Sequence, residues 1–195
     1  MQAAPVKPSD TMFRILDAAE ACMARYGLRV SMADVAVEAG VSRGTVYNAF
    51  GDRAAVADAV LARTADRFVA ASAPVVDRRR TLAGQVGEAA VFITSHLDDA
   101  ALTVRLPGER DSLLATLLTA RTETLVDRWV EFWQPKLSAA EHRGEIRAGL
   151  DQRRAGEWIV RLLLTFAVMP SVAIDLSDPD AVRAFVKDHL VRGLC

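Results

Sequence analysis

The chain has 195 residues, of which 51% are hydrophobic, so it can bury the core of one substantial domain or of two small ones. Its formal net charge of -1 gives no overall basic excess, and a nucleic-acid partner would therefore have to be recognised by a local surface. The two cysteines imply no disulfide framework, the N-terminus lacks the apolar segment of a secretory signal, and the apolar run 162–169 is too short to span a bilayer.

Apolar residues recur with a helical period along nearly every segment, so the expected fold class is all-α. A first helix is predicted over residues 10–26, and its apolar stripe consists of Met12, Ile15, Leu16, Ala19, Met23 and Tyr26. Ser31 with Asp34 predicts a capping box at the start of a second helix. Ser42 is the expected cap of a third helix, and Asp52 caps a fourth that extends to about residue 72.

The rest of the chain predicts further helices over 81–97 and 100–105, and a long helix from about residue 111. Pro135 should kink or end that helix, and Ser138 with Glu141 predicts a capping box for a short continuation. Asp151 caps a strongly apolar helix, and Asp178 followed by Pro179 opens the last one. We expect residues 1–52 to form one domain and residues 53–195 a second, larger one.

The stretch 33–50 has the spacing of a helix-turn-helix, Ala-x3-Gly-x5-Val. Val35, Ala36 and Ala39 are expected to face inward, and the small Ala36 allows a second helix to cross close by. Gly40 stands where the turn favours a left-handed backbone, and Val46 points back into the core. In this motif the second helix enters the major groove of DNA. The alternative is an ordinary glycine-containing helix corner with solvated polar residues.

Polar side chains on the outward face of the third predicted helix suit contacts to a DNA duplex. Arg43 can donate to guanine or phosphate, and Asn48 suits adenine. Tyr47 can donate to phosphate, and Gly44 lets the backbone approach closely. Arg53, at the start of the next helix, can form a phosphate clamp with the free N–H groups there.

At these residues the sequence resembles the TetR (tetracycline-repressor-like) family of bacterial transcription regulators. The resemblance lies in "RILDAAEACMARYG", "SMADVAVEAGVSRGTVYNAFGDRAAV" and, more weakly, "RGEIRAGLD". Ala49 stands where the family commonly has His or Tyr, and Arg53 replaces a common Lys. The resemblance implies about nine helices, a homodimer, a palindromic double-stranded DNA operator and release from it by a small-molecule effector. The DNA-binding candidates are Ser31, Ser42, Arg43, Gly44, Thr45, Tyr47, Asn48 and Arg53.

The two last predicted helices carry more apolar surface than one monomer face needs, which favours a four-helix dimer interface over a simple core. The candidate interface residues are Trp158, Ile159, Leu162, Leu163, Phe166, Val182, Phe185, Val186, His189 and Leu190. An effector pocket is expected among the middle helices, although the same residues also suit an ordinary core. Its candidate lining residues are Phe68, Phe92, Ile93, His96, Leu117, Arg121, Leu125, Trp129, Phe132 and Trp133.

No pattern in the sequence indicates catalysis, a bound metal or a cofactor. His96 with Asp98 and Asp99, and His142 with Glu145, have no further clear partner at metal-ligand spacing. Phosphate-binding loops, nucleophile elbows and CxxC motifs are missing from the sequence. We expect a cytoplasmic repressor with no membrane partner. Two alternatives stay open: a helical small-molecule-binding protein or enzyme whose N-terminal corner is only structural, and a DNA binder without any effector.

Overall fold

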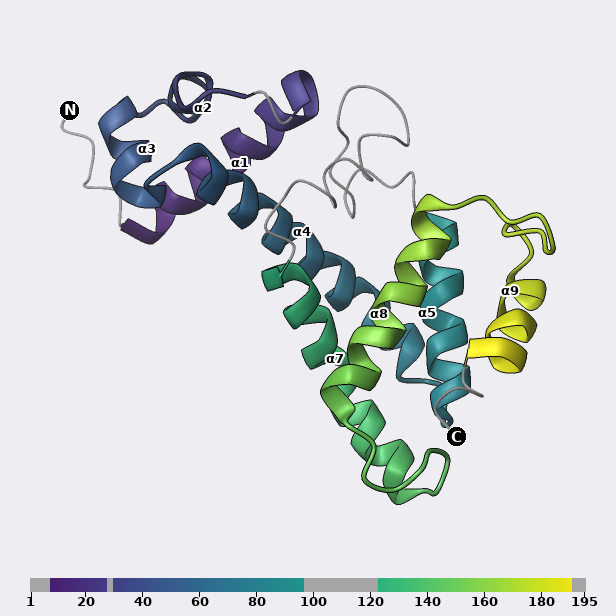
Figure 1. The fold of residues 1–195 in the computed structure, drawn as a ribbon. Helices are drawn as coiled ribbons and strands as arrows, with labels where there is room; N and C mark the ends of the chain where they lie inside the picture. Colours follow the sequence, from purple (N-terminus) through teal and green to yellow (C-terminus); the bar gives the residue numbers. More distant parts are fainter. Residues whose placement is uncertain (1–7, 28–29, 97–122, 191–195) are drawn as a thin grey trace. The chain divides into compact units, whose positions relative to one another are not determined.

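The computed structural model describes residues 8–27, 30–96 and 123–190 of the chain (Figure 1). These residues form eight α-helices and one π-helical turn, and no strand occurs among them, so the all-α prediction is confirmed. The residues through Thr64 belong to one compact unit, and the described residues from Ala65 onward belong to another. None of the helices in the described ranges has the length and apolar character that crossing a membrane requires.

The first unit consists of α1 (Pro8–Tyr26), α2 (Met32–Ala39), α3 (Arg43–Phe50) and the first part of α4 (Arg53–Val76). One hydrophobic cluster joins these helices, and its innermost side chains include Ile15, Met23, Val35, Val46, Val56 and Val60. The predicted stripe of the first helix is too long at both ends. Met12 is 45% exposed and Tyr26 is 55% exposed, because the buried part of α1 extends only from Ile15 to Met23.

The second unit consists of the rest of α4, α5 (Leu82–His96), α7 (Glu123–His142), α8 (Gln152–Val168), α9 (Pro179–Phe185) and the π-helical turn η2 (Val186–Leu190). α8 packs against both α5 and α7, and α9 with η2 packs on α5 (Figure 1). Their shared core includes Leu82, Val86, Val130, Trp133, Leu137, Ile159, Val182 and Val186.

Two prolines interrupt the helices less than the sequence predicts. α4 continues past residue 72 through Pro74 to Val76, and α7 continues through Pro135 to His142. An interior proline costs about 3 kcal/mol. Trp133 and Leu137 on either side of Pro135 are buried, and each contributes about 1.5–3 kcal/mol, which outweighs the lost hydrogen bond. Pro135 therefore does not end the helix, and the other predicted outcome, a kink at Pro135, stays a prediction.

The capping box predicted for Ser138 and Glu141 is wrong, because both side chains lie inside α7 and reach forward to the start of α8, Glu141 also contacting the loop before it. Ser138 Oγ donates to Gln152 Oε1 at 2.7 Å. Glu141 accepts from the Gly149 amide at 2.7 Å and from Gln152 Nε2 at 2.9 Å, and these hydrogen bonds lower the pKa of its carboxyl. The two residues therefore hold the 143–151 loop against α7. The helices predicted at 100–105 and from 111 lie outside the described residues up to the start of α7.

Candidate nucleic-acid interface

The corner between α2 and α3 is fixed by local hydrogen bonds that follow the predicted caps. Ser31 and Asp34 form the full capping box of α2, and the hydrogen bonds from the Ser31 side chain and backbone lower the pKa of Asp34. Gly40 ends α2 in the left-handed conformation, with φ 62 and ψ 39. Ser42 Oγ then accepts from the Thr45 amide at 3.0 Å and caps α3.

A contact between residues far apart in the sequence also holds this corner, and no sequence pattern predicted it. Arg14 of α1 donates from Nη2 to the carbonyl of Ala39 at 2.7 Å. A cation at the C-terminal end of α2 satisfies a free carbonyl and interacts favourably with the helix dipole. Residues 14 and 39 are too far apart in sequence for helical periodicity to pair them.

The inner side of α3 is anchored and its outer side is open. Val46 is fully buried in the core of the first unit. Arg43, Gly44, Asn48 and Tyr47 are exposed, Tyr47 by 44%. Within the described part of the chain, the Arg43 guanidinium has neither a hydrogen bond nor an ion pair. The polar face of α3 is therefore presented to solvent by a helix that cannot rotate without exposing its core residue.

The other four DNA-binding candidates, Ser31, Ser42, Thr45 and Arg53, are partly engaged in local structure. Thr45 is half-buried, and its Oγ1 lies 2.8 Å from Ser42 Oγ. Ser31 Oγ donates to Asp34 Oδ2 at 2.6 Å. Arg53 is exposed at the first position of α4, where the Asp52 carboxylate already accepts the Ala55 amide at 2.8 Å. Asp52 thus takes up one of the N–H groups expected to join Arg53 in a phosphate clamp.

Three acidic residues of the first unit form ion pairs with arginines other than Arg43. Arg25 forms a bidentate ion pair with Glu38, with both N–O distances 2.8 Å. That hydrogen bonding raises the pKa of Arg25 and lowers the pKa of Glu38. Arg63 of α4 pairs with Asp17 and Glu20 of α1. The first unit can therefore have a balanced overall charge while Arg43 on α3 has no acidic partner among the described residues.

The predicted pocket residues fall into three groups. Phe68 packs edge-to-face on Phe92, with ring centroids 5.1 Å apart, and Phe92 stacks on His96 at 4.1 Å. Trp133 belongs to the core of the second unit, with Ile93, Trp129 and Phe132 half-buried against that core. The side chains of Leu117, Arg121 and Leu125 lie outside the described residues. The structure thus brings Phe68, Phe92 and His96 together.

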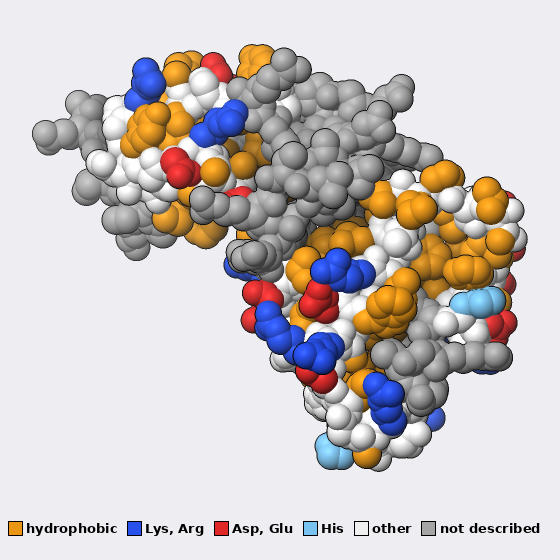
Figure 2. Space-filling view, in the orientation of Figure 1, with side chains coloured by type: hydrophobic (Ala, Val, Ile, Leu, Met, Phe, Trp, Pro, Cys, Tyr) orange, Lys and Arg blue, Asp and Glu red, His pale blue; other side chains and the backbone are white. Residues whose placement is uncertain are grey.

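The predicted dimer residues divide between the core and the surface. Ile159, Leu163, Phe166, Val182 and Val186 are buried in the core of the second unit, so they finish the monomer as α8 and α9 pack on α5. Trp158 is 48% exposed, His189 is exposed and stacks on Phe185, and Leu162 is half-buried. The side chain of Leu190 lies outside the described residues. Hydrophobic side chains remain visible on the surface of α8 (Figure 2).

Residues 30–96, 123–190 and the described part of α1 contain no cluster of metal-ligating side chains. Cys22 is buried, and burial raises the pKa of its thiol. Packing in the core of the first unit accounts for this residue.

Comparisons with known proteins agree on one family. Residues 15–60 match the model of the bacterial regulatory proteins of the tetR family. An HTH-type transcriptional regulator of Mycobacterium tuberculosis H37Rv, Rv2250c, is 31% identical over 193 residues, which are 96% of each chain.

Solved structures show the same fold at lower identity. Salmonella enterica GusR is 22% identical, with a TM-score of 0.62 and 97% of each chain covered. AlkX, a TetR family repressor from Dietzia sp. implicated in biodegradation of n-alkanes, is 24% identical, with a TM-score of 0.62 and 94% of each chain covered. The chain therefore belongs to the TetR family, whose members are DNA-binding transcriptional regulators and not enzymes.

Proposed function

We propose that this regulator is a ligand-responsive repressor that binds a palindromic operator as a homodimer. The observation that carries the proposal is the open polar face of α3, where Arg43 stands exposed and without a partner among the described residues. Residues 1–52 form the DNA-binding domain in this proposal. Residues 53–195 then provide effector binding and dimerisation.

In this proposal each polar side chain of the interface contacts the part of the DNA that suits its chemistry. Arg43 donates to a guanine edge or a phosphate, and Asn48 pairs with an adenine edge. Tyr47 donates its hydroxyl to a phosphate, and Gly44 leaves room for the sugar-phosphate backbone. Arg53 contacts a phosphate as a charge, and the hydroxyls of Ser31, Ser42 and Thr45 add hydrogen bonds at the helix ends.

A homodimer is supported by the apolar surface that the second unit leaves uncovered. Trp158 on α8 is 48% exposed, and Met169 and Val172 directly after α8 are 62% and 104% exposed. Large exposed apolar groups of this kind mark interaction sites. Two recognition helices related by a two-fold axis fit successive major grooves when they lie about 34 Å apart, one turn of DNA, and the two-fold symmetry calls for a palindromic operator.

An effector acts, in this proposal, through α4, a helix that contributes to both units. α4 carries Val56 and Val60 in the core of the first unit and Val76 in the core of the second. An effector bound near Phe68, Phe92 and His96 stabilises one arrangement of α4 over another. A coupling free energy of about 1–3 kcal/mol is typical and would weaken operator binding about 5- to 150-fold.

Selection from random duplexes tests the operator. The wild-type protein is expected to enrich an inverted repeat, whereas the Arg43→Ala/Thr45→Ala double variant enriches none. An Arg78→Ala variant, which changes an exposed arginine of the second unit, serves as the control and should enrich the same repeat. Enrichment of a sequence without two-fold symmetry, or no enrichment by the wild-type protein, contradicts the proposal.

The effector is tested separately by thermal shift across a small-molecule library, because a ligand that binds only the folded state raises the melting temperature by mass action. A stabilising compound must then lower operator affinity at constant salt. Compounds that bind but leave operator affinity unchanged would contradict ligand-controlled release and leave DNA recognition intact.

A further inference from the structure

A small basic pocket lies between the start of α5 and the C-terminal helix, inside the second unit. Its volume is about 210 Å³, below the roughly 300–1,000 Å³ that drug-sized ligands occupy. Its lining comprises Arg79, Thr81, Ala83, Gly84, Gly87, Arg183 and Lys187. Three of these residues are cationic and none is acidic, so the pocket suits a small anion.

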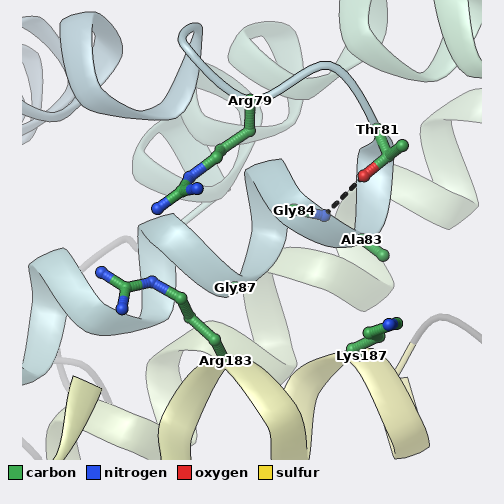
Figure 3. Close-up of a pocket in the computed structure, with 7 residues that line it drawn as sticks. All are labelled: Arg79, Thr81, Ala83, Gly84, Gly87, Arg183 and Lys187. Carbon is green, nitrogen blue, oxygen red and sulfur yellow. Dashed lines mark hydrogen bonds between the residues drawn. The ribbon is translucent and has the colours of Figure 1, made fainter. Parts of the chain in front are cut away.

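The cations approach the pocket from two segments that are far apart in sequence. In Figure 3 the guanidinium groups of Arg79 and Arg183 lie toward one side of the pocket, and Lys187 and Thr81 lie toward the other. The first turns of α5, with Gly84 and Gly87, lie between them, and the Thr81 hydroxyl accepts the Gly84 amide at 3.2 Å. A Cβ on Gly84 would lie 3.0 Å from Thr81 Oγ1, and a Cβ on Gly87 would lie 3.6 Å from Arg183 Cα, so the glycines let α9 and the segment before α5 approach this helix closely.

The two arginines of the pocket already share one carboxylate, that of Glu88. Glu88 accepts from Arg79 Nη2 at 2.7 Å and from Arg183 Nε at 3.2 Å, and its side chain is 14% exposed. Burial opposes ionisation of Glu88, but the hydrogen bonds from Arg183 and Arg79 outweigh burial and lower its pKa. Glu88 is therefore ionised at neutral pH and neutralises only one of the two guanidinium charges.

The remaining positive charge has little compensation nearby. Asp180 accepts from Arg183 Nη1 at 2.8 Å, but its side chain is 93% exposed, so water screens that pair. Lys187 is exposed and has no ion-pair partner within the described ranges. The three cations outnumber Glu88 and the screened Asp180, which leaves a net positive charge that an oxyanion would balance.

We propose that this pocket binds a phosphate group, as free orthophosphate or as the phosphate of a small monoester. A tetrahedral dianion can accept from Lys187 and the Thr81 hydroxyl on one side of the pocket, while the guanidinium groups of Arg79 and Arg183 add positive charge from the other side. A planar monoanionic carboxylate has fewer acceptor positions and half the charge. The site lies wholly in the second unit, so it does not depend on DNA binding by α3.

The test measures binding of sodium phosphate and of methyl phosphate to the full chain by calorimetry, near neutral pH, with ionic strength held constant by sodium chloride. Orthophosphate is expected to bind saturably at one site per chain. Tighter binding of methyl phosphate identifies a monoester as the preferred ligand, and equal or weaker binding identifies free orthophosphate. Sodium acetate, as the carboxylate control, should bind more weakly than either.

Variants assign the binding to this pocket. Lys187→Gln removes an exposed charge that makes no ion pair among the described residues, and it should weaken phosphate binding about 5- to 30-fold. Arg80→Gln is the matched control, because Arg80 is exposed beside Arg79 but does not line the pocket, and binding should be unchanged. Glu88→Gln should tighten binding, since it releases both arginines from their competing carboxylate.

Three results would overturn the proposal: no saturable binding of phosphate, equal losses in Lys187→Gln and Arg80→Gln, or acetate binding as tightly as phosphate. Lys187→Gln and Arg80→Gln change exposed side chains and leave the core intact, so they decide the question even where Glu88→Gln fails to fold.

Discussion

Replacing Gly40 by alanine should destabilise the α2–α3 corner by about 1–2 kcal/mol, the cost of holding an L-residue in the left-handed region. Gly40 has φ 62 and ψ 39, and its amide donates to the carbonyls of Ala36 and Val37 at the end of α2. An added Cβ would lie 3.5 Å from Arg14 Nη2, which is ordinary contact with the flexible end of a side chain. The cost is therefore conformational and not steric.

Gly44→Ala is the matched control because it makes the same chemical change four residues later. A Cβ on Gly44 would lie 3.6 Å from Ser42 Oγ, again ordinary contact, and Gly44 has no positive φ. Alanine there should raise helix stability by up to about 0.5–1 kcal/mol. Its methyl group would nevertheless obstruct the close backbone approach that we propose for DNA, so operator affinity should fall.

Urea unfolding followed by circular dichroism measures both variants. The midpoint for Gly40→Ala should fall below that of the wild-type protein, and the midpoint for Gly44→Ala should equal or exceed it. A Gly40→Ala protein as stable as Gly44→Ala would refute the reasoning from backbone conformation.

The remaining predictions concern charge, pH and the core. Arg43→Gln should change stability by less than about 0.5 kcal/mol, because Arg43 is exposed and has no partner among the described residues. If Arg43 contacts phosphate, the slope of log operator affinity against log salt should shrink by about 1.8 per dimer, and Arg78→Gln should leave that slope unchanged. For Glu88, the folded-state pKa lies below its usual value of 4.5, so its stabilisation is present above that pH and is lost as pH falls through the folded-state pKa. Urea unfolding of Glu88→Gln from pH about 6 to about 3 should show a shallower loss of stability below pH about 4.5 than the wild type, and an equal loss would contradict this account. Leu137→Ala should cost about 2–5 kcal/mol of unfolding free energy, because Leu137 is fully buried in α7 two residues past Pro135. A loss below about 1 kcal/mol would mean that α7 does not pack there beyond the proline.

Local signals in the sequence predicted the helix starts well, because a cap is made within three or four residues. Ser31, Ser42, Asp151 and Asp178 each accept a backbone amide at the start of the helix they were expected to cap. The inward residues of the helix-turn-helix were predicted for the same reason, since one helical period sets which side chains share a face.

Features that depend on contacts between segments far apart in the sequence could not be predicted from local patterns. Pro135 is a helix breaker by its own chemistry, and only the burial of its neighbours against α8 and α5 keeps α7 intact. The contact of Arg14 with Ala39 and the convergence of Arg79 with Arg183 join residues that no short-range pattern links. Arg79 lies in an exposed loop, and no pattern in the sequence pairs it with Glu88.

The most direct test of the central claim is a gel shift with duplex DNA from upstream of this protein's own reading frame. Wild-type protein and the Arg43→Ala/Thr45→Ala variant are compared at two salt concentrations, with Arg78→Ala as the control. We predict a discrete complex that weakens with salt, persists in Arg78→Ala and disappears in the double variant. A complex that the double variant forms as well as the wild-type protein would contradict recognition of DNA by the exposed face of α3.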